Sequence, residues 1–187
     1  MANQLREQYG EIVDGLLGRY PKKESAILAL MHLAQQIHGY MSQQAMQEVA
    51  EILDIDSTHV LSLAGFYSLY YEEPVGKYVL EVCTDLACAL RGADQFLAMT
   101  LEKLGVGIDE VTADGLFTIK PVMCLAACDK APMLQCNLRY HENLDEEKFD
   151  ALIARLRAES AAAPGEREPS VVEHIMSYAA GDPSVRE

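Results

Sequence analysis

Apolar side chains recur every three or four positions through the first third of the chain, the spacing of an amphipathic helix. In the first such segment, Leu5, Ile12 and Leu16 fall on one helical stripe. The same period predicts further helices, so that the helical segments are about 5–17, 25–37, 43–53 and 57–64. Short amphipathic helices with short connections are typical of a small helical bundle.

Residues that typically begin, end or separate helices occur at the expected helix boundaries. Proline disfavours a helical residue before it, so Pro21 should separate the first helix from the second. Gly39 is the expected C-cap of the second helix. Ser42 is a suitable N-cap for the third helix, and Asp56 or Ser57 for the fourth.

From Tyr78 the pattern changes to that of strands alternating with helices. We expect a strand at 78–83, a helix at 92–104 and a second strand at 116–122. Two short extended pieces at 133–136 and 138–140, a turn near Asn137 and a final helix after Asp145 complete the order. The order β-α-β-β-α is that of a thioredoxin-like core, whose β-α-β unit should cross over right-handed.

These patterns divide the 187 residues into three parts. Residues 1–72 form a helical bundle and residues 73–160 form the thioredoxin-like domain. Residues 161–187 read as a C-terminal linker and tail, because 161–169 are rich in alanine, proline, glycine and charge. Within the tail, 171–176 could form one amphipathic turn.

The charge of the chain limits its partners. Its formal net charge is -14, which disfavours binding to nucleic acids and to anionic membranes, since both are polyanions. It has no apolar run long enough to cross a bilayer, and residues 1–6 lack the features of a secretory signal. We therefore expect a reducing, cytoplasmic environment, in which thiols serve as ligands more often than as disulfides.

Four of the five cysteines occur as two closely spaced pairs. Cys83 and Cys88 form a CxxxxC pair after the first expected strand, and Cys124 and Cys128 form a CxxxC pair after the second. Thiolates in short loops at strand ends ligate iron–sulfur clusters or structural zinc. One metal centre shared by both pairs is therefore expected, with iron–sulfur favoured because zinc knuckles usually have CxxC spacing.

Other chemistries fit the chain less well. Thioredoxin-type redox activity uses a CxxC motif, which is absent, and the spacing of plant-type ferredoxins is absent too. Cys136 lies in an apolar segment and reads as a buried small side chain. The histidines lack ligand spacing, and no nucleotide-binding loop of the GxGxxG or GxxxxGK[ST] type occurs.

At these motifs the chain resembles a known family, the E-type iron–sulfur subunits in the peripheral arm of NADH:quinone oxidoreductase, or bacterial complex I. The mitochondrial counterpart of that family is flavoprotein 2. The resemblance covers about residues 10–157. Beyond the two cysteine pairs, it rests on segments 64–68, 74–78, 110–117, 131–132 and 137–144.

The resemblance implies a helical N-terminal domain followed by a thioredoxin-like [2Fe–2S] ferredoxin domain. It implies one [2Fe–2S] cluster held by Cys83, Cys88, Cys124 and Cys128. The family's partner is the neighbouring F-type flavin subunit, which binds NADH and FMN. The chain would take one electron from that FMN as a peripheral subunit at the inner face of the cytoplasmic membrane, and it would not be catalytic alone.

Two alternatives to this function stay open from the sequence. The first is the same [2Fe–2S] module within an NAD-linked hydrogenase or a formate dehydrogenase. The second is a zinc-stabilised scaffold that docks onto partners. One departure from the family also bears on the site: many relatives have glycine where this chain has Ala126. If that position needs a positive φ, alanine costs about 1 kcal/mol there.

Overall fold

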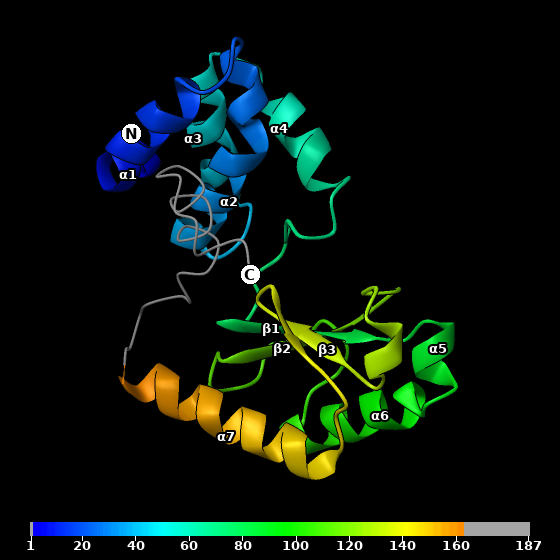
Figure 1. Ribbon diagram of the computed structural model, residues 1–187. Coiled ribbons are helices and arrows are strands. Elements are labelled where there is room, and N and C mark those ends of the chain that lie inside the picture. The colour runs from blue at the N-terminus through cyan, green and yellow to red at the C-terminus, as the bar shows by residue number, and fades with distance from the viewer. Residues whose placement is uncertain (1, 163–187) are drawn as a thin grey trace. The chain divides into compact units, whose positions relative to one another are not determined.

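The computed structural model describes residues 2–162, which form two compact units, residues 2–74 and residues 75–162 (Figure 1). The expected tail lies outside the described residues, except for Ala161 and Ala162, which end the last helix. Within the described part, no helix combines the length and the hydrophobicity that crossing a membrane would require.

The first unit is a helical bundle, as the apolar periodicity predicts. Its helices are α1 (Gln4–Leu17), α2 (Ile27–His38), α3 (Gln43–Leu53) and α4 (Ser57–Ala64), with a 3₁₀ turn, η1 (Lys23–Ala26), before α2. The core is built from one apolar stripe of each helix and includes Leu5, Val13, Leu30, Met31, Leu33, Val49, Leu53 and Val60. The predicted start of the second helix at 25 is wrong by two residues, because the chain first makes the tighter 3₁₀ turn.

The predicted caps of this unit are confirmed. The Ser42 hydroxyl accepts a hydrogen bond from Ala45 N at 3.1 Å, and Asp56 Oδ1 accepts one from Thr58 N at 2.8 Å. Gly39 ends α2 with φ 85°, a left-handed conformation that favours glycine. Each cap satisfies backbone groups that a helix end leaves unpaired.

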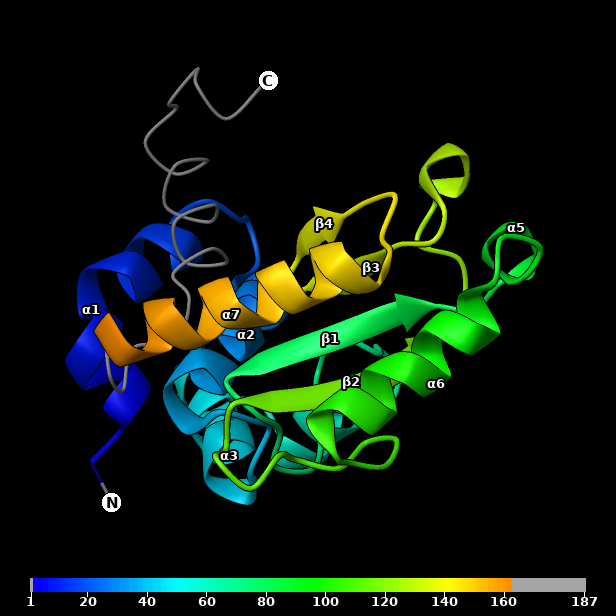
Figure 2. The same ribbon diagram turned by 90° about the horizontal axis from the view of Figure 1, so that it is seen from below.

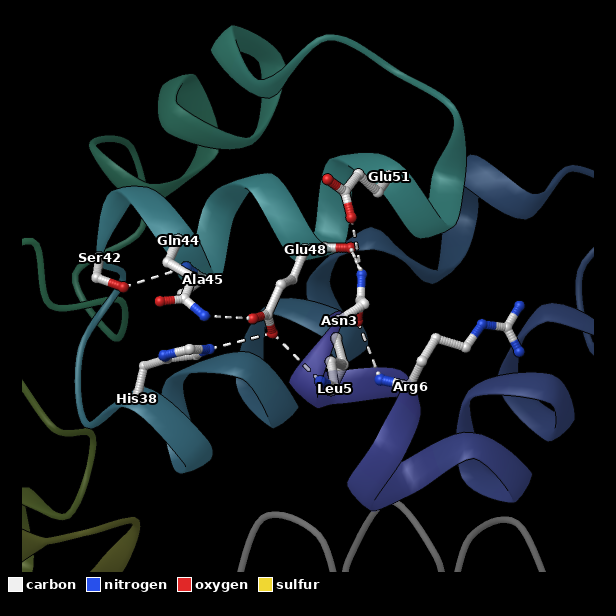
Figure 3. Close-up of polar contacts among 9 residues, drawn as sticks. All are labelled: Asn3, Leu5, Arg6, His38, Ser42, Gln44, Ala45, Glu48 and Glu51. Atoms are coloured by element: carbon white, nitrogen blue, oxygen red, sulfur yellow. Dashed lines mark hydrogen bonds and ion pairs between the residues drawn. The ribbon is translucent and has the colours of Figure 1, made fainter. Parts of the chain in front are cut away.

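A buried carboxylate joins three helices of this unit (Figure 3). Glu48 of α3 is 4% exposed, and its Oε2 accepts hydrogen bonds from Leu5 N at 3.2 Å and from His38 Nε2 at 3.1 Å. Its Oε1 accepts from Gln44 Nε2 at 3.0 Å. Burial alone would raise the pKa of Glu48, but these hydrogen bonds outweigh it and lower the pKa. The carboxylate thus ties the first turn of α1 to α2 and α3.

The second unit is a mixed four-stranded sheet with two long helices on one face (Figure 2). The strands are β1 (Tyr78–Cys83), β2 (Phe117–Val122), β3 (Leu134–Cys136) and β4 (Arg139–His141), in the order β2-β1-β3-β4. β1 pairs parallel with β2 and antiparallel with β3, which pairs antiparallel with β4. The helices α6 (Ala93–Leu104) and α7 (Glu146–Ala162) cover one face of the sheet. The core of this unit includes residues of the sheet and of both helices, namely Leu80, Val82, Phe96, Phe117, Ile119, Leu134, Phe149 and Leu152.

The hairpin between β3 and β4 turns at Asn137 and Leu138, both of which have positive φ, of 44° and 77°. Two central residues with positive φ match the twist of the flanking strands. The Asn137 side chain also ties the turn to β1, since its Oδ1 accepts from Val79 N at 2.9 Å and its Nδ2 donates to Lys77 O at 3.0 Å. The hairpin is therefore fixed in position relative to the centre of the sheet.

Candidate metal centre

The parallel pairing of β1 and β2 brings the two cysteine loops to the same edge of the sheet. Cys83 ends β1 and lies opposite Val122, which ends β2. Thr84 N donates to Val122 O at 2.9 Å, and Cys124 follows two residues later. The carboxyl ends of adjacent parallel strands meet at one edge, so both loops begin side by side.

The first cysteine pair is buried in a small apolar cluster. Cys83 is 3% exposed and Cys88 is 2% exposed, and they pack with Ala93, Ala131 and Met133. Cys88 lies on a short helix, α5 (Leu86–Ala89), within what the sequence predicts as a loop. The prediction of a loop is wrong there, because a single turn of helix is too short to show as periodicity.

The second cysteine pair is exposed and close together. Cys124 and Cys128 are both exposed, and their sulfur atoms lie 3.6 Å apart. Two thiolates bound to one tetrahedral metal at about 2.3 Å would be roughly 3.8 Å apart. The separation therefore fits two ligands of one metal ion.

Neighbouring thiols raise the pKa of one cysteine in each pair. Burial, the neighbouring Cys83 thiol and, to a smaller extent, Cys128 and Cys124 together raise the pKa of Cys88 to about 12. The pKa of Cys128 is raised by its hydrogen bond with Cys124 and also by Asp85. Such a group of sulfurs resists becoming anionic together, and a bound cation would remove that resistance.

The donors come as two pairs. Within residues 2–162 no three His, Cys, Asp or Glu side chains converge as the ligands of a single ion would. A [2Fe–2S] cluster takes two protein thiolates on each iron. The arrangement of the four predicted cysteines fits that donor set, while Cys136 is a buried residue of β3.

The loop between Cys124 and Cys128 has a left-handed residue at its centre. Ala126 has φ 62°, so the condition under which alanine costs stability at this position is met. Its N–H donates to Cys124 Sγ at 3.4 Å. The conformation thus places a backbone donor against a candidate ligand.

Glycine at position 126 is expected to stabilise the second unit by about 0.5–1 kcal/mol, because it removes the left-handed strain of alanine. Urea unfolding of the full chain, followed by far-UV circular dichroism, measures the change. Ala127 has φ -110°, so Ala127→Gly should instead be neutral or destabilising. Equal effects of the two substitutions would contradict the strain argument.

Sequence reasoning missed one residue at this site. Tyr140 of β4 donates a hydrogen bond from its hydroxyl to Leu125 O, within the second cysteine loop, at 2.7 Å. The contact spans fifteen residues of sequence and depends on the β3–β4 hairpin, so no local pattern indicates it.

Comparisons with known proteins show the family to which the chain belongs. Residues 13–157 match the family described as thioredoxin-like [2Fe–2S] ferredoxin. An E-type subunit of NADH-quinone oxidoreductase from Rhizobium meliloti (strain 1021) is 38% identical over 164 residues, which span 83% of this chain and 98% of the relative. NADH-quinone oxidoreductase subunit 2 of Thermus thermophilus is 37% identical over 151 residues, which span 79% of this chain and 83% of the relative.

A solved structure supports the fold. The crystal structure of an NAD+-reducing [NiFe]-hydrogenase in the air-oxidized state matches with a TM-score of 0.61 at 21% identity. The match covers 70% of this chain but only 23% of the hydrogenase chain. At that identity the likeness establishes a shared fold and nothing about shared activity.

Proposed function

Because this chain belongs to the thioredoxin-like [2Fe–2S] ferredoxin family, we propose that it is the electron-transfer subunit of an NADH:quinone oxidoreductase. The relatives that are 37–38% identical over most of their length carry the names of subunits of that complex. In this role the chain receives one electron from the FMN of a neighbouring flavin subunit that also binds NADH. It acts as part of an oxidoreductase complex and not as an enzyme alone.

The ligands we propose are Cys83 and Cys88 for one iron and Cys124 and Cys128 for the other. The observation that carries this assignment is the meeting of both pairs at one edge of the sheet, with 3.6 Å between the sulfurs of Cys124 and Cys128. When bound, the cluster supplies a one-electron redox couple. The apolar surroundings of Cys83 and Cys88 limit water on the inner side, and the exposed second pair leaves an edge that a redox partner can approach.

In the proposed role the chain lies in the peripheral arm of the complex, at the inner face of the cytoplasmic membrane, without inserting into the bilayer. The F-type flavin subunit is its proposed neighbour. A module of an NAD-linked hydrogenase is the second candidate, because the cysteine spacing and the order of the elements also occur in that class. The higher identity to quinone oxidoreductase subunits favours the first.

Electron paramagnetic resonance of the anaerobically purified full chain, with iron, sulfide and zinc analysis, tests the proposal. We expect about two irons per chain, a silent oxidised state and an S = ½ signal after dithionite. Stoichiometric zinc without iron would instead support the structural scaffold and would remove the electron-transfer function. Mixing the chain with flavin subunits of either complex type then tests which of them it binds.

A further inference from the structure

One peptide group in the second cysteine loop has both of its polar ends engaged. The carbonyl of Leu125 accepts the Tyr140 hydroxyl at 2.7 Å. The N–H of Ala126, which belongs to the same planar peptide group, donates to Cys124 Sγ at 3.4 Å. The Tyr140 hydroxyl is thereby connected to a candidate ligand sulfur through a single peptide.

The two hydrogen bonds of this peptide group are coupled. A donor to the carbonyl oxygen withdraws electron density from the peptide and makes its N–H a stronger donor, so the two hydrogen bonds strengthen each other. A hydrogen bond to a ligand sulfur stabilises the more negative, reduced form of an iron–sulfur centre and raises its reduction potential. The left-handed φ of Ala126 belongs to the loop conformation in which one peptide serves both contacts.

We propose that Tyr140 is a positioning residue that raises the reduction potential of the centre through the Leu125–Ala126 peptide. This inference rests on the proposed function, since it requires Cys124 to hold the cluster. Tyr140 is well placed for such a role, because β4 and the Asn137 turn fix its backbone relative to the sheet. Its hydroxyl acts by donating to the loop and does not itself touch the sulfur.

Charged side chains near the second cysteine loop influence the reduction potential less directly than Tyr140 does. Asp129 and Lys130 directly follow the second pair in the sequence, but Lys130 Nζ lies 3.8 Å from Asp129 Oδ2, and the two side chains are 45% and 79% exposed. Opposite charges offset each other, and where they are exposed, water and salt screen both of them. The hydrogen-bonded path from Tyr140, by contrast, ends in contact with the sulfur.

The test is a redox titration of the cluster-loaded full chain, followed by paramagnetic resonance, with Tyr140→Phe beside the unaltered chain. Linked hydrogen bonds strengthen each other modestly, by roughly a tenth to a third of the strength of one bond. We therefore expect the equilibrium constant for reduction of the cluster to fall on the order of threefold in Tyr140→Phe. For a one-electron couple that is a potential lower by about 30 mV. The matched control is Tyr20→Phe, because Tyr20 is 41% exposed and lies in the helical unit, and it should leave the potential unchanged.

A second measurement separates polarisation from simple bracing of the loop. 3-Fluorotyrosine placed at position 140 keeps the shape of tyrosine but carries a more acidic hydroxyl, and it should raise the potential when the pH keeps that hydroxyl protonated. A brace would not respond to acidity. If Tyr140→Phe loses the cluster, the fluorotyrosine variant decides the question.

The inference is overturned if the potential stays the same in the fluorotyrosine variant, or in a Tyr140→Phe protein with full iron and sulfide. Failure of the proposed function looks different, because an unaltered chain that takes up no iron would remove that function and this inference with it.

Discussion

Serine in place of Cys124 is expected to lower the cluster content of the purified chain by roughly tenfold or more. Even the outer partners of metal ligands cost about 10–100-fold in affinity when they are removed, and Cys124 is a proposed ligand itself. Its sulfur lies 3.6 Å from that of Cys128 and accepts the Ala126 N–H. A serine hydroxyl is a far weaker acid than a thiol, so the substitution would leave one iron short of a thiolate. Iron and sulfide per chain, together with the spin count after dithionite, measure the loss.

The chain offers its own control for this experiment. Cys136 is the fifth cysteine, 2% exposed in β3, and is not a proposed ligand. Cys136→Ala should therefore keep about two irons per chain and an unchanged signal. An unchanged, full-strength signal in Cys124→Ser would show that the ligand assignment is wrong, and loss of the signal in Cys136→Ala would point to Cys136 in its place.

The sequence predicts those parts of the fold that short-range interactions determine. Ser42, Asp56 and Gly39 satisfy backbone groups within a few residues of themselves, so their roles follow from residue type and position. The positive φ of Ala126 does not follow from residue type, because alanine disfavours it; only the glycine that many relatives have at this position raises it as a condition. The strand and helix order follows from hydrophobic periodicity, which the buried faces of β1 and α6 preserve.

The roles of some polar side chains depend on tertiary contacts, and the sequence does not predict them. Glu48 lies on a helix that is otherwise solvated on its polar side, and no local pattern indicates that its carboxylate meets Leu5, 43 residues earlier. The Tyr140 contact with Leu125 likewise exists only because the β3–β4 hairpin folds beside the second cysteine loop. Such polar groups reveal their roles only when the elements are assembled.

Alanine in place of Glu48 is expected to destabilise the helical unit by about 2–3 kcal/mol, because it removes a buried carboxylate that accepts three hydrogen bonds. The substitution leaves Leu5 N–H, His38 and Gln44 without their acceptor in a site where water cannot easily replace it. Hydrogen exchange of amides in α1, measured by mass spectrometry on the full chain, reports this loss within the affected unit. Peptides from the second unit serve as an internal reference in the same sample.

The effect should depend on pH in a defined direction. The folded-state pKa of Glu48 lies below its unfolded value, so its contribution is complete above the unfolded pKa of about 4.3 and is lost as the pH falls through the lower, folded value. The difference in stability between the unaltered chain and Glu48→Ala should therefore be constant near neutral pH and shrink below about pH 4.3.

Glu51→Ala is the matched control, because Glu51 lies one helical turn further along α3 and also bonds to the N-terminal segment, through Asn3 at 3.3 Å. That contact is exposed, so its loss should change stability by less than about 0.5 kcal/mol. If Glu48→Ala and Glu51→Ala had equal effects, the buried carboxylate would not be what anchors α1. A large effect of Glu48→Ala alone, fading in acid, would show that one ionised side chain holds the first helix of the bundle in place.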